Sequence, residues 1–383
     1  MPAFNSAAES LSGAPVDLFI IGGGVNGCGI ARDAAGRGLS VTLAEMGDLA
    51  SATSSASTKL FHGGLRYLEY FDLRLVREAL IEREVLLRAM PHIARPMRFV
   101  LPLHPKMRFE NHTPAARLLD RIMPWMRGRR PAWLIRLGLL LYDNLGGRRI
   151  LPGTRRLSLR DHPEGKALKD AFRLAYEYSD CTVDDARLVV LNARDAQARG
   201  AVIRTRTMVR SARREGALWH LVLEDQATGR QDGIRARMLI NAAGPWVAEV
   251  VRDTIHGESH EPVRLVRGSH IVTRRLFDHD KSYFLQGRDG RIMFMIPWRG
   301  DFTLIDTTDC DHDDPDTPPV CTDAERAYMI AFVNDYLARP ITDAEVVWSF
   351  SGMRPLHGDT SGSASATSSP RSCSSAASSQ VRN

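Results

Sequence analysis

The 383-residue chain contains few cysteines, and none of them form a C-x-x-C pair. The five are scattered, at Cys28, Cys181, Cys310, Cys321 and Cys373. An odd number without close spacing excludes a small domain stapled by disulfides and argues against a structural zinc site. The same pattern favours a reducing compartment.

The sequence also lacks a long, uninterrupted hydrophobic run. The longest, residues 134–142, contains Arg136 and is far shorter than the ~20 residues that a membrane span needs. Residues 1–15 have neither a basic start nor an apolar stretch, so we expect a disordered leader and no signal peptide. The length and the 44% hydrophobic content suit two or three domains, and a net charge of +6 does not identify a nucleic-acid-binding protein.

Positive charge is concentrated in one part of the chain. Residues 106–160 hold 13 Lys and Arg against three acids, Glu110, Asp120 and Asp143, which leaves the rest of the chain net negative. Trp and Leu recur in the same stretch at near-helical spacing. This composition is typical of a helix lying in a membrane interface; the alternative is a pair of surface helices packed on a domain.

The first recognisable unit is a strand, a turn, a helix and a second strand. The apolar residues 17–21 predict a buried strand, residues 28–37 predict a helix with an alanine-rich face, and residues 39–44 predict a second strand. The turn between the first strand and the helix reads Gly22-Gly-Gly-Val-Asn-Gly27. This order is typical of the start of a dinucleotide-binding domain.

Three glycines and one acid in this unit predict where a dinucleotide binds. Gly22 allows a tight turn, Gly24 lets the backbone approach a pyrophosphate, and Gly27 lets the helix pack closely on the strand. Glu45 follows the second strand, where a carboxylate accepts hydrogen bonds from an adenosine ribose. An acid there disfavours NADP, whereas the glycines alone do not separate NAD from FAD.

Short hydroxyl-bearing side chains fill residues 50–58, ahead of the run His62-Gly-Gly-Leu-Arg-Tyr-Leu-Glu69. Such side chains and free amides suit a long ligand held closely along the chain, which favours FAD. A serine-rich surface linker is the alternative, and it fits poorly with the apolar residues that follow. The side chains we expect to contact the cofactor are Thr53, Ser54, Ser55 and Ser57.

Farther along the chain, residues 71–90 predict a long amphipathic helix. Strands are predicted at residues 201–209, 218–224, 235–242, 264–273, 291–297 and 302–305. Residues 360–383 differ in kind, since ten of these 24 residues are serine and no apolar face is present. We expect this tail to be disordered and without function.

A set of longer motifs makes a family resemblance specific. Ser54-Ser-Ala-Ser57 together with the run from His62 to Glu69 resembles the FAD-dependent glycerol-3-phosphate dehydrogenases, respiratory enzymes of bacteria and mitochondria. Further motifs of this family are Glu177-Tyr-Ser-Asp-Cys-Thr-Val-Asp-Asp-Ala-Arg-Leu188, Asn241-Ala-Ala-Gly-Pro-Trp246, Arg267-Gly-Ser-His-Ile-Val272, Ile296-Pro-Trp298, Thr307-Thr-Asp309 and Ser351-Gly-Met-Arg-Pro-Leu356. The resemblance covers residues 16–358 in order.

The resemblance implies an α/β fold of the glucose and D-amino-acid oxidase type. In that fold, a Rossmann-like FAD-binding domain is interleaved with a substrate domain built on an antiparallel sheet. We expect residues 16–95 and 185–262 to form the FAD-binding domain. Residues 96–184 and 263–358 would then form the substrate domain, with the basic stretch as its membrane-facing insert.

The implied reaction is the oxidation of sn-glycerol 3-phosphate to dihydroxyacetone phosphate, with a hydride passed to FAD and electrons passed on to a membrane quinone. Carried over from the family motifs, Arg66, Tyr67 and Arg354 are the substrate and phosphate contacts. His270 takes the proton of the C2 hydroxyl or orients that hydroxyl. Gly244 passes near the FAD phosphates.

From the residues themselves we expect non-covalent FAD, no metal and no nucleic acid. The resemblance, together with the basic stretch, implies peripheral attachment to an anionic membrane surface, the cytoplasmic face of a bacterial inner membrane, partly through residues 106–160. It leaves a homodimer open.

The sequence departs from the family in three places. Asp306 stands where the family usually has glycine, and we expect its carboxylate to repel a phosphate. The insert between residues 105 and 131 is longer than in the short bacterial members. After residue 356 the family continues with a strand and a segment that covers the flavin, whereas here the low-complexity tail follows, as in a truncated or frameshifted gene.

Two alternatives therefore stay open. One is a catalytically impaired fragment of the enzyme, which the tail supports. The other, less favoured by the long motifs, is an FAD-dependent oxidase of amino acids or amines, in which Arg66 and Arg354 would hold a carboxylate.

Overall fold

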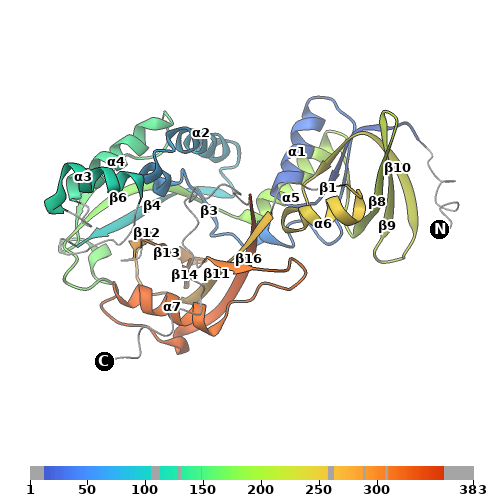
Figure 1. The fold of residues 1–383 in the computed structure, drawn as a ribbon. Helices are drawn as coiled ribbons and strands as arrows, with labels where there is room; N and C mark the ends of the chain where they lie inside the picture. The colour runs from blue at the N-terminus through green and yellow to red at the C-terminus, as the bar shows by residue number, and fades with distance from the viewer. Residues whose placement is uncertain are drawn as a thin grey trace.

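The computed structural model describes residues 13–104, 113–126, 131–147, 149–257, 263–287, 290–306 and 309–357. Figure 1 shows two lobes, each built around one β-sheet, with strand β16 (Val346–His357) between them. The expected leader, apart from its last residues, and the expected tail at residues 360–383 lie outside the described residues.

The first sheet has six strands. Its order is β7 (Val202–Arg204), β2 (Val41–Ala44), β1 (Val16–Ile21), β10 (Gln231–Asn241), β9 (Leu218–Asp225) and β8 (Thr207–Glu215). The four strands from β7 to β10 run parallel, and β9 and β8 continue the sheet antiparallel. This is the Rossmann-like half of the expected fold.

Helices α1 (Val25–Gly36) and α5 (Asp185–Ala198) pack together against this sheet (Figure 1). Alanines of both helices are buried in the shared core, and their small side chains allow close packing. Helix α1 begins three residues earlier than predicted, because Gly24 is the residue that caps it. Part of the glycine-rich turn is therefore the first turn of the helix.

The predicted strand at residues 201–209 is in fact two strands. β7 lies beside β2 at one end of the sheet, and β8 pairs with β9 at the other. Arg206 separates them with a positive φ of 51°, which breaks the extended conformation. Its amide donates a hydrogen bond to the carbonyl oxygen of Gly47 at 2.8 Å, so the break follows the loop after β2.

The second sheet has ten strands and is mostly antiparallel. Its main path is β15 (Cys310–His312), β11 (Val263–Arg274), β14 (Phe302–Ile305), β13 (Ile292–Trp298), β12 (Ser282–Gln286), β4 (Ala94–Leu103), β6 (Leu174–Val183) and β3 (Leu60–Phe61). β16 pairs with β11, and β5 (Arg155–Ser158) pairs with β6. The predicted antiparallel layer is thus present, and β12 and β4 are its parallel pair.

Helices cover both faces of the second sheet. α2 (Leu73–Ala89) and α4 (Ala132–Leu145) enclose an aromatic core with the sheet, and α7 (Asp323–Asn334) packs on a second core. Figure 1 shows α2, α4 and α3 (Pro114–Ile122) on one side of this lobe and α7 on the other. The short α6 (Val247–Glu249) belongs to the first lobe.

Residues 60–95 lie with the second sheet, although the division expected from sequence placed them in the FAD-binding domain. Leu60 and Phe61 pair with Thr182 and Cys181 of β6, and the apolar face of α2 joins the aromatic core of the second sheet. An amphipathic pattern predicts a helix but does not tell which sheet the helix covers. The wider division of the chain remains a prediction.

Three cysteines are free thiols in the part of the chain that the structure describes, namely Cys28, Cys181 and Cys321. Burial raises the pKa of Cys28 and Cys181 to about 12.

A buried ionic network fixes the start of the His62–Glu69 run. The Arg83 guanidinium of α2 donates to the Asp180 carboxylate of β6, and both are about 4% exposed or less. The Tyr142 hydroxyl of α4 donates to the same carboxylate and accepts the amide proton of Gly63 at 2.7 Å. Burial raises the pKa of Asp180, so these donors are what keep a charge at this site tolerable.

We predict that Tyr142→Phe lowers the free energy of unfolding by about 1.5–3 kcal/mol, because a buried carboxylate and a buried amide each lose a partner. Tyr178→Phe is the matched control, since Tyr178 is equally buried but its hydroxyl makes no hydrogen bond to a described residue. Chemical denaturation of both variants measures the difference. Equal losses would contradict the role given to the Tyr142 hydroxyl.

Candidate functional site

The glycine-rich turn is so tight that two of its positions accept only glycine. Gly22 has a φ of +109°, and a Cβ atom there would lie 2.4 Å from the carbonyl oxygen of Ala242 on the neighbouring strand. A Cβ atom on Gly27 would lie 1.9 Å from the carbonyl oxygen of Gly22. Helix α1 therefore starts directly against the end of β1, as the pattern predicted.

A cavity of about 370 Å³ opens at this turn, beyond the carboxyl ends of β1 and β2. This edge of a parallel sheet is where such folds bind nucleotides. The predicted cofactor residues that line the cavity are Gly22, Gly24, Glu45, Thr53, Ser54 and Gly244. Other parts of its wall come from residues 207–209, and from Trp246, Val250 and Thr254.

The polar groups of this cavity suit the ADP part of FAD. Glu45 accepts hydrogen bonds from the amides of Gly23 at 2.6 Å and Gly47 at 2.8 Å, which fixes its carboxylate at the rim. Gly24 has no side chain to cap α1, and Ser54 binds only the amide of Val25, so the amides of Asn26 and Gly27 have no partner among the described residues. A helix start of this kind binds phosphate groups, and a fixed carboxylate binds ribose hydroxyls.

The hydroxyl-rich segment is tied to protein groups as well as to the cavity. Ser54 Oγ accepts the amide proton of Val25 at 3.0 Å, and Ser57 Oγ donates to Asp185 at 2.7 Å. Ser55 Oγ donates to the carbonyl oxygen of Ala52 at 3.2 Å. Gly27, Ser55 and Ser57 do not line the cavity, so their expected cofactor contacts remain predictions.

A second region of interest lies on the β11–β16 pair. His270 of β11 is paired with Phe350 of β16, and their rings stack at 4.5 Å with an angle of 6°. The His270 side chain is 4% exposed. Its Nε2 lies 3.2 Å from an oxygen of Asp306, which also accepts a hydrogen bond from Thr58 at 2.9 Å. Sequence reasoning assigned Thr58 no role.

The surroundings of the Asp306 carboxylate differ from those expected from its position in the sequence. We expected a carboxylate that opposes a phosphate, but the side chain is buried against His270 and Thr58. Asp306 does not have a positive φ, so nothing in this backbone requires glycine here. The neighbouring residues 307–308 of the family motif lie outside the described residues.

Arg354 shares a face of β16 with Phe350 and Gly352, because side chains alternate along a strand. Four residues separate Arg354 from Phe350, which corresponds to about 13 Å along the strand. A Cβ atom on Gly352 would lie 2.9 Å from the Cβ of Ala56, so the hydroxyl-rich segment crosses this face. Thr53 also donates to the carbonyl oxygen of Met353.

The two candidate phosphate-binding arginines differ in their partners. The Arg354 guanidinium, 43% exposed, is paired with the Asp309 carboxylate. Arg66 makes no hydrogen bond or ion pair with another described residue. Arg66 and Tyr67 belong to a 3₁₀ turn (Leu65–Tyr70) whose Tyr67 ring packs on the aromatic core that also holds Phe350. No contact in the described residues joins Arg66 to Arg354 or His270, so their common role remains a prediction.

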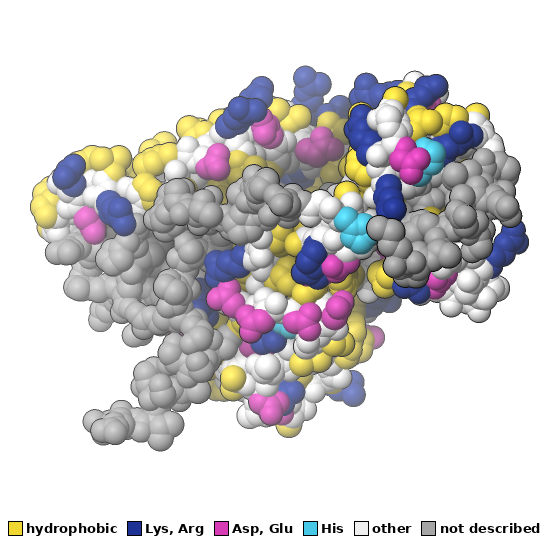
Figure 2. Space-filling model, turned by 45° about the vertical axis from the view of Figure 1, so that its right-hand side comes forward, with side chains coloured by type: hydrophobic (Ala, Val, Ile, Leu, Met, Phe, Trp, Pro, Cys, Tyr) yellow, Lys and Arg dark blue, Asp and Glu magenta, His cyan; other side chains and the backbone are white. Residues whose placement is uncertain are grey.

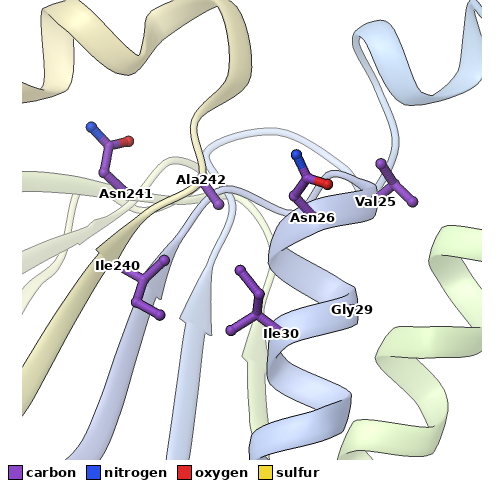
Figure 3. A pocket seen from close by; sticks show the side chains of 7 residues that line it. All are labelled: Val25, Asn26, Gly29, Ile30, Ile240, Asn241 and Ala242. Carbon is purple, nitrogen blue, oxygen red and sulfur yellow. The ribbon is translucent and has the colours of Figure 1, made fainter. Parts of the chain in front are cut away.

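A second hollow flanks the first helix. It measures about 410 Å³ and lies between the start of α1 and the end of β10 (Figure 3). Ile30 and Ile240 form its apolar floor, and Asn26 and Asn241 lie above them. The Asn241 amide is already bound to the carbonyl oxygen of Val247 at 2.9 Å, so this hollow offers few free polar groups.

The sequence matches the family model described as FAD dependent oxidoreductase over residues 17–371. The chain belongs to this family. The expected flavoprotein fold and the expected FAD cofactor are thereby confirmed. Among the described residues, no three His, Cys, Asp or Glu side chains form a group that could hold a metal ion.

Relatives of known activity agree with the resemblance found in the motifs. The chain is 50% identical to a D-erythritol 1-phosphate dehydrogenase of Brucella abortus, 48% to a glycerol-3-phosphate dehydrogenase of Pseudomonas aeruginosa and 46% to the aerobic glycerol-3-phosphate dehydrogenase of Escherichia coli. Each match covers 91% of this chain but only 63–65% of the relative. The chain thus spans less than two thirds of the length of these relatives.

Solved structures lead to the same fold. The glycerol-3-phosphate dehydrogenase of Bacillus halodurans, solved with FAD, superimposes with a TM-score of 0.65 at 26% identity, covering 92% of this chain and 59% of that one. The L-α-glycerophosphate oxidase of Mycoplasma pneumoniae, also with FAD bound, gives 0.67 at 17% identity, covering 91% and 85%. At such low identity the second likeness concerns the fold alone.

We predict that Gly27→Ala abolishes FAD binding, because its methyl group would force the start of α1 away from β1 by well over 1 Å. Gly29→Ala, on the same helix, is the control, since a Cβ atom there meets nothing within 4 Å. Flavin retained after purification, measured by absorbance per protein, checks the prediction. Retention of flavin by Gly27→Ala would mean that the turn can relax.

Proposed function

We propose that this chain carries the FAD-binding and substrate-binding part of a dehydrogenase that oxidises sn-glycerol 3-phosphate to dihydroxyacetone phosphate and passes the electrons to a membrane quinone. The observation that carries the proposal is the face of the β11–β16 pair. A buried histidine, His270, and a half-exposed arginine, Arg354, share this face with the segment that lines the nucleotide cavity.

The proposed reaction requires cationic groups that bind a phosphate and a base that accepts a proton, and this region provides candidates for both. A phosphate dianion is best held by guanidinium groups, and Arg354 and Arg66, which has no partner among the described residues, supply two. Removal of a hydride from C2 requires a base for the hydroxyl proton, a role we assign to His270. FAD, when bound, supplies the acceptor for that hydride. The identities of 46–48% to glycerol-3-phosphate dehydrogenases support the same substrate.

A longer polyol phosphate is a second candidate substrate, because a relative with 50% identity is named D-erythritol 1-phosphate dehydrogenase. Anaerobic titration of the purified, FAD-loaded chain separates the candidates. Loss of flavin absorbance with glycerol 3-phosphate supports the proposal. Loss of absorbance only with erythritol 1-phosphate would identify erythritol 1-phosphate as the substrate instead. Loss only with an amino acid indicates an oxidase of amino acids, and bound flavin that no substrate reduces indicates an impaired fragment.

We predict that Arg354→Ala and Arg66→Ala each weaken the apparent affinity for glycerol 3-phosphate by roughly ten- to a hundredfold, the value of about 1.5–3 kcal/mol for a charge-assisted hydrogen bond. Flavin content should stay unchanged, because neither side chain lines the nucleotide cavity. Arg264→Ala is the control, since Arg264 lies nearby on β11 and pairs with Asp311. Unchanged affinity in both variants would refute the assignment.

We further propose that α3 and α4 attach the protein peripherally to the cytoplasmic face of a bacterial inner membrane. Within the described ranges, none of the helices combines the length and hydropathy that crossing a bilayer requires. Both helices nevertheless expose large apolar side chains. These are Leu118, Ile122, Trp133, Leu137, Leu140 and Leu141, and Trp125, which is 74% exposed, follows α3 in a 3₁₀ turn (Pro124–Met126).

Basic residues accompany these apolar side chains. Arg117, Arg121 and Arg136 are exposed on the same two helices. Figure 2 shows hydrophobic and basic side chains interspersed along the upper left of the molecule, the lobe that carries these helices in Figure 1. This mixture suits an anionic lipid interface. Residues 105–112, 127–130 and 148 of the basic stretch lie outside the described residues.

We predict that replacing Arg117, Arg121 and Arg136 by Gln weakens binding to phosphatidylglycerol-containing vesicles by about a hundredfold, since each basic residue near such a surface contributes about 1 kcal/mol. Replacement of Arg37, Arg187 and Arg339, exposed elsewhere, is the control. Vesicle sedimentation at low and high salt measures both. Equal binding by the two triple variants would exclude these helices as the anchor.

A further inference from the structure

A carboxylate and a histidine are buried together beside the face proposed to bind substrate. Asp306 directly follows β14, and its amide donates to the carbonyl oxygen of Phe294 at 3.1 Å, which fixes the backbone. One oxygen of its side chain, Oδ1, lies 3.2 Å from Nε2 of His270. Both side chains are 4% exposed, so water does not compete for this contact.

The other ring nitrogen of His270 has no such partner. Nδ1 is buried and makes no hydrogen bond to a described residue. The ring cannot turn freely, because Phe350 stacks on it at 4.5 Å. A neutral imidazole carries a proton on one nitrogen and a lone pair on the other, and the groups that face the two nitrogens decide which. A carboxylate oxygen 3.2 Å away repels a lone pair and attracts an N–H group, so Asp306 favours the form with the proton on Nε2.

We propose that Asp306 is a positioning residue that holds the proton of His270 on Nε2 and thereby leaves Nδ1 as the proton acceptor for the substrate hydroxyl. This inference rests on the proposed function. In the reaction, the O–H bond of the C2 hydroxyl breaks and its proton goes to Nδ1. The hydride leaves C2 with its electron pair for FAD, so that the alcohol is oxidised to a ketone as FAD is reduced. The resulting imidazolium is stabilised by Asp306.

Thr58 links this pair to the nucleotide site. Its hydroxyl donates to the same Asp306 oxygen at 2.9 Å and lies 3.3 Å from Nε2 of His270. Thr58 ends the segment whose Thr53 and Ser54 line the nucleotide cavity. A movement of that segment would therefore change the orientation of the Asp306 carboxylate.

Other charged groups near the ring neutralise each other. The Lys59 ammonium lies over the Phe350 ring, 5.2 Å from its centroid, and donates to the Asp185 carboxylate at 2.8 Å. Of the charges in this cluster, Asp306 is thus the one in direct contact with His270.

The first test reads the ring directly, in FAD-loaded protein without substrate. Nitrogen-15 NMR of protein labelled at histidine shows which ring nitrogen carries the proton, and His270→Gln identifies the signal. We expect the proton on Nε2 in the wild type and a mixture of forms in Asp306→Ala. A proton on Nδ1 in the wild type would overturn the proposal.

The second test separates charge from hydrogen bonding. Asp306→Asn keeps an oxygen that can accept from Thr58 and lie near Nε2, but it removes the charge. Protonation of His270 then becomes less favourable, so the loss of kcat at low pH should move to lower pH. Asp306→Ala should lower kcat about ten- to a hundredfold with little change in KM, because it removes both the charge and the acceptor.

Asp311→Asn is the matched control, since Asp311 is an exposed acid near this region that pairs with Arg264. It should leave the pH profile, kcat and the ring signal unchanged. An Asp306→Asn profile identical to that of the wild type would overturn the positioning role, as a merely structural acid would give that result. If the proposed function is wrong, no polyol phosphate will reduce the bound flavin. The nitrogen-15 signal of the His270 ring tests the role of Asp306 independently of that result.

Discussion

The arrangement of both sites depends on one short stretch of chain, residues 51–59, which runs from the first sheet to the second. Its side chains bond in turn to the start of α1, to the backbone of β16, to Asp185 of α5 and to Asp306 after β14. Hydroxyl groups suit this task because each can donate and accept within a narrow space. The stretch therefore sets the distance between the nucleotide cavity and the β11–β16 face.

Buried charges are tolerated in the second sheet because each has several partners. Glu177 of β6 is 1% exposed and binds Arg98, Arg155 and Lys281. Burial raises its pKa, yet the hydrogen bonds from Arg98 and Arg155 outweigh burial and hold the pKa below its usual value. A buried group of ion pairs of this kind is costly to break but adds little to the free energy of unfolding when it is intact. It therefore restricts the register of β4, β5 and β6 more than it stabilises the fold.

The sequence predicts best what depends on neighbours along the chain. The turn at Gly22, the first two strands and the cavity residues Gly24 and Glu45 follow from local pattern, whereas the cavity wall at residues 207–209, Trp246, Val250 and Thr254 was not predicted. The break at Arg206 does not, because it depends on a contact with Gly47 across the sheet. The partner of His270 could not be found either, since Thr58, His270 and Asp306 meet only when three distant segments fold together.

Under the proposed function, a physical reason explains why a buried base and an exposed arginine occupy one face. As the proposed base, His270 needs a dry environment in which its contact with Asp306 favours a single form. Arg354 needs access to an anion, and its pairing with Asp309 keeps the guanidinium oriented without sequestering it. A pair about 40% exposed on both sides contributes little to stability, so a phosphate dianion can displace or share the carboxylate at low cost. In the proposed reaction, the face thus combines a fixed proton acceptor with an exchangeable anion site.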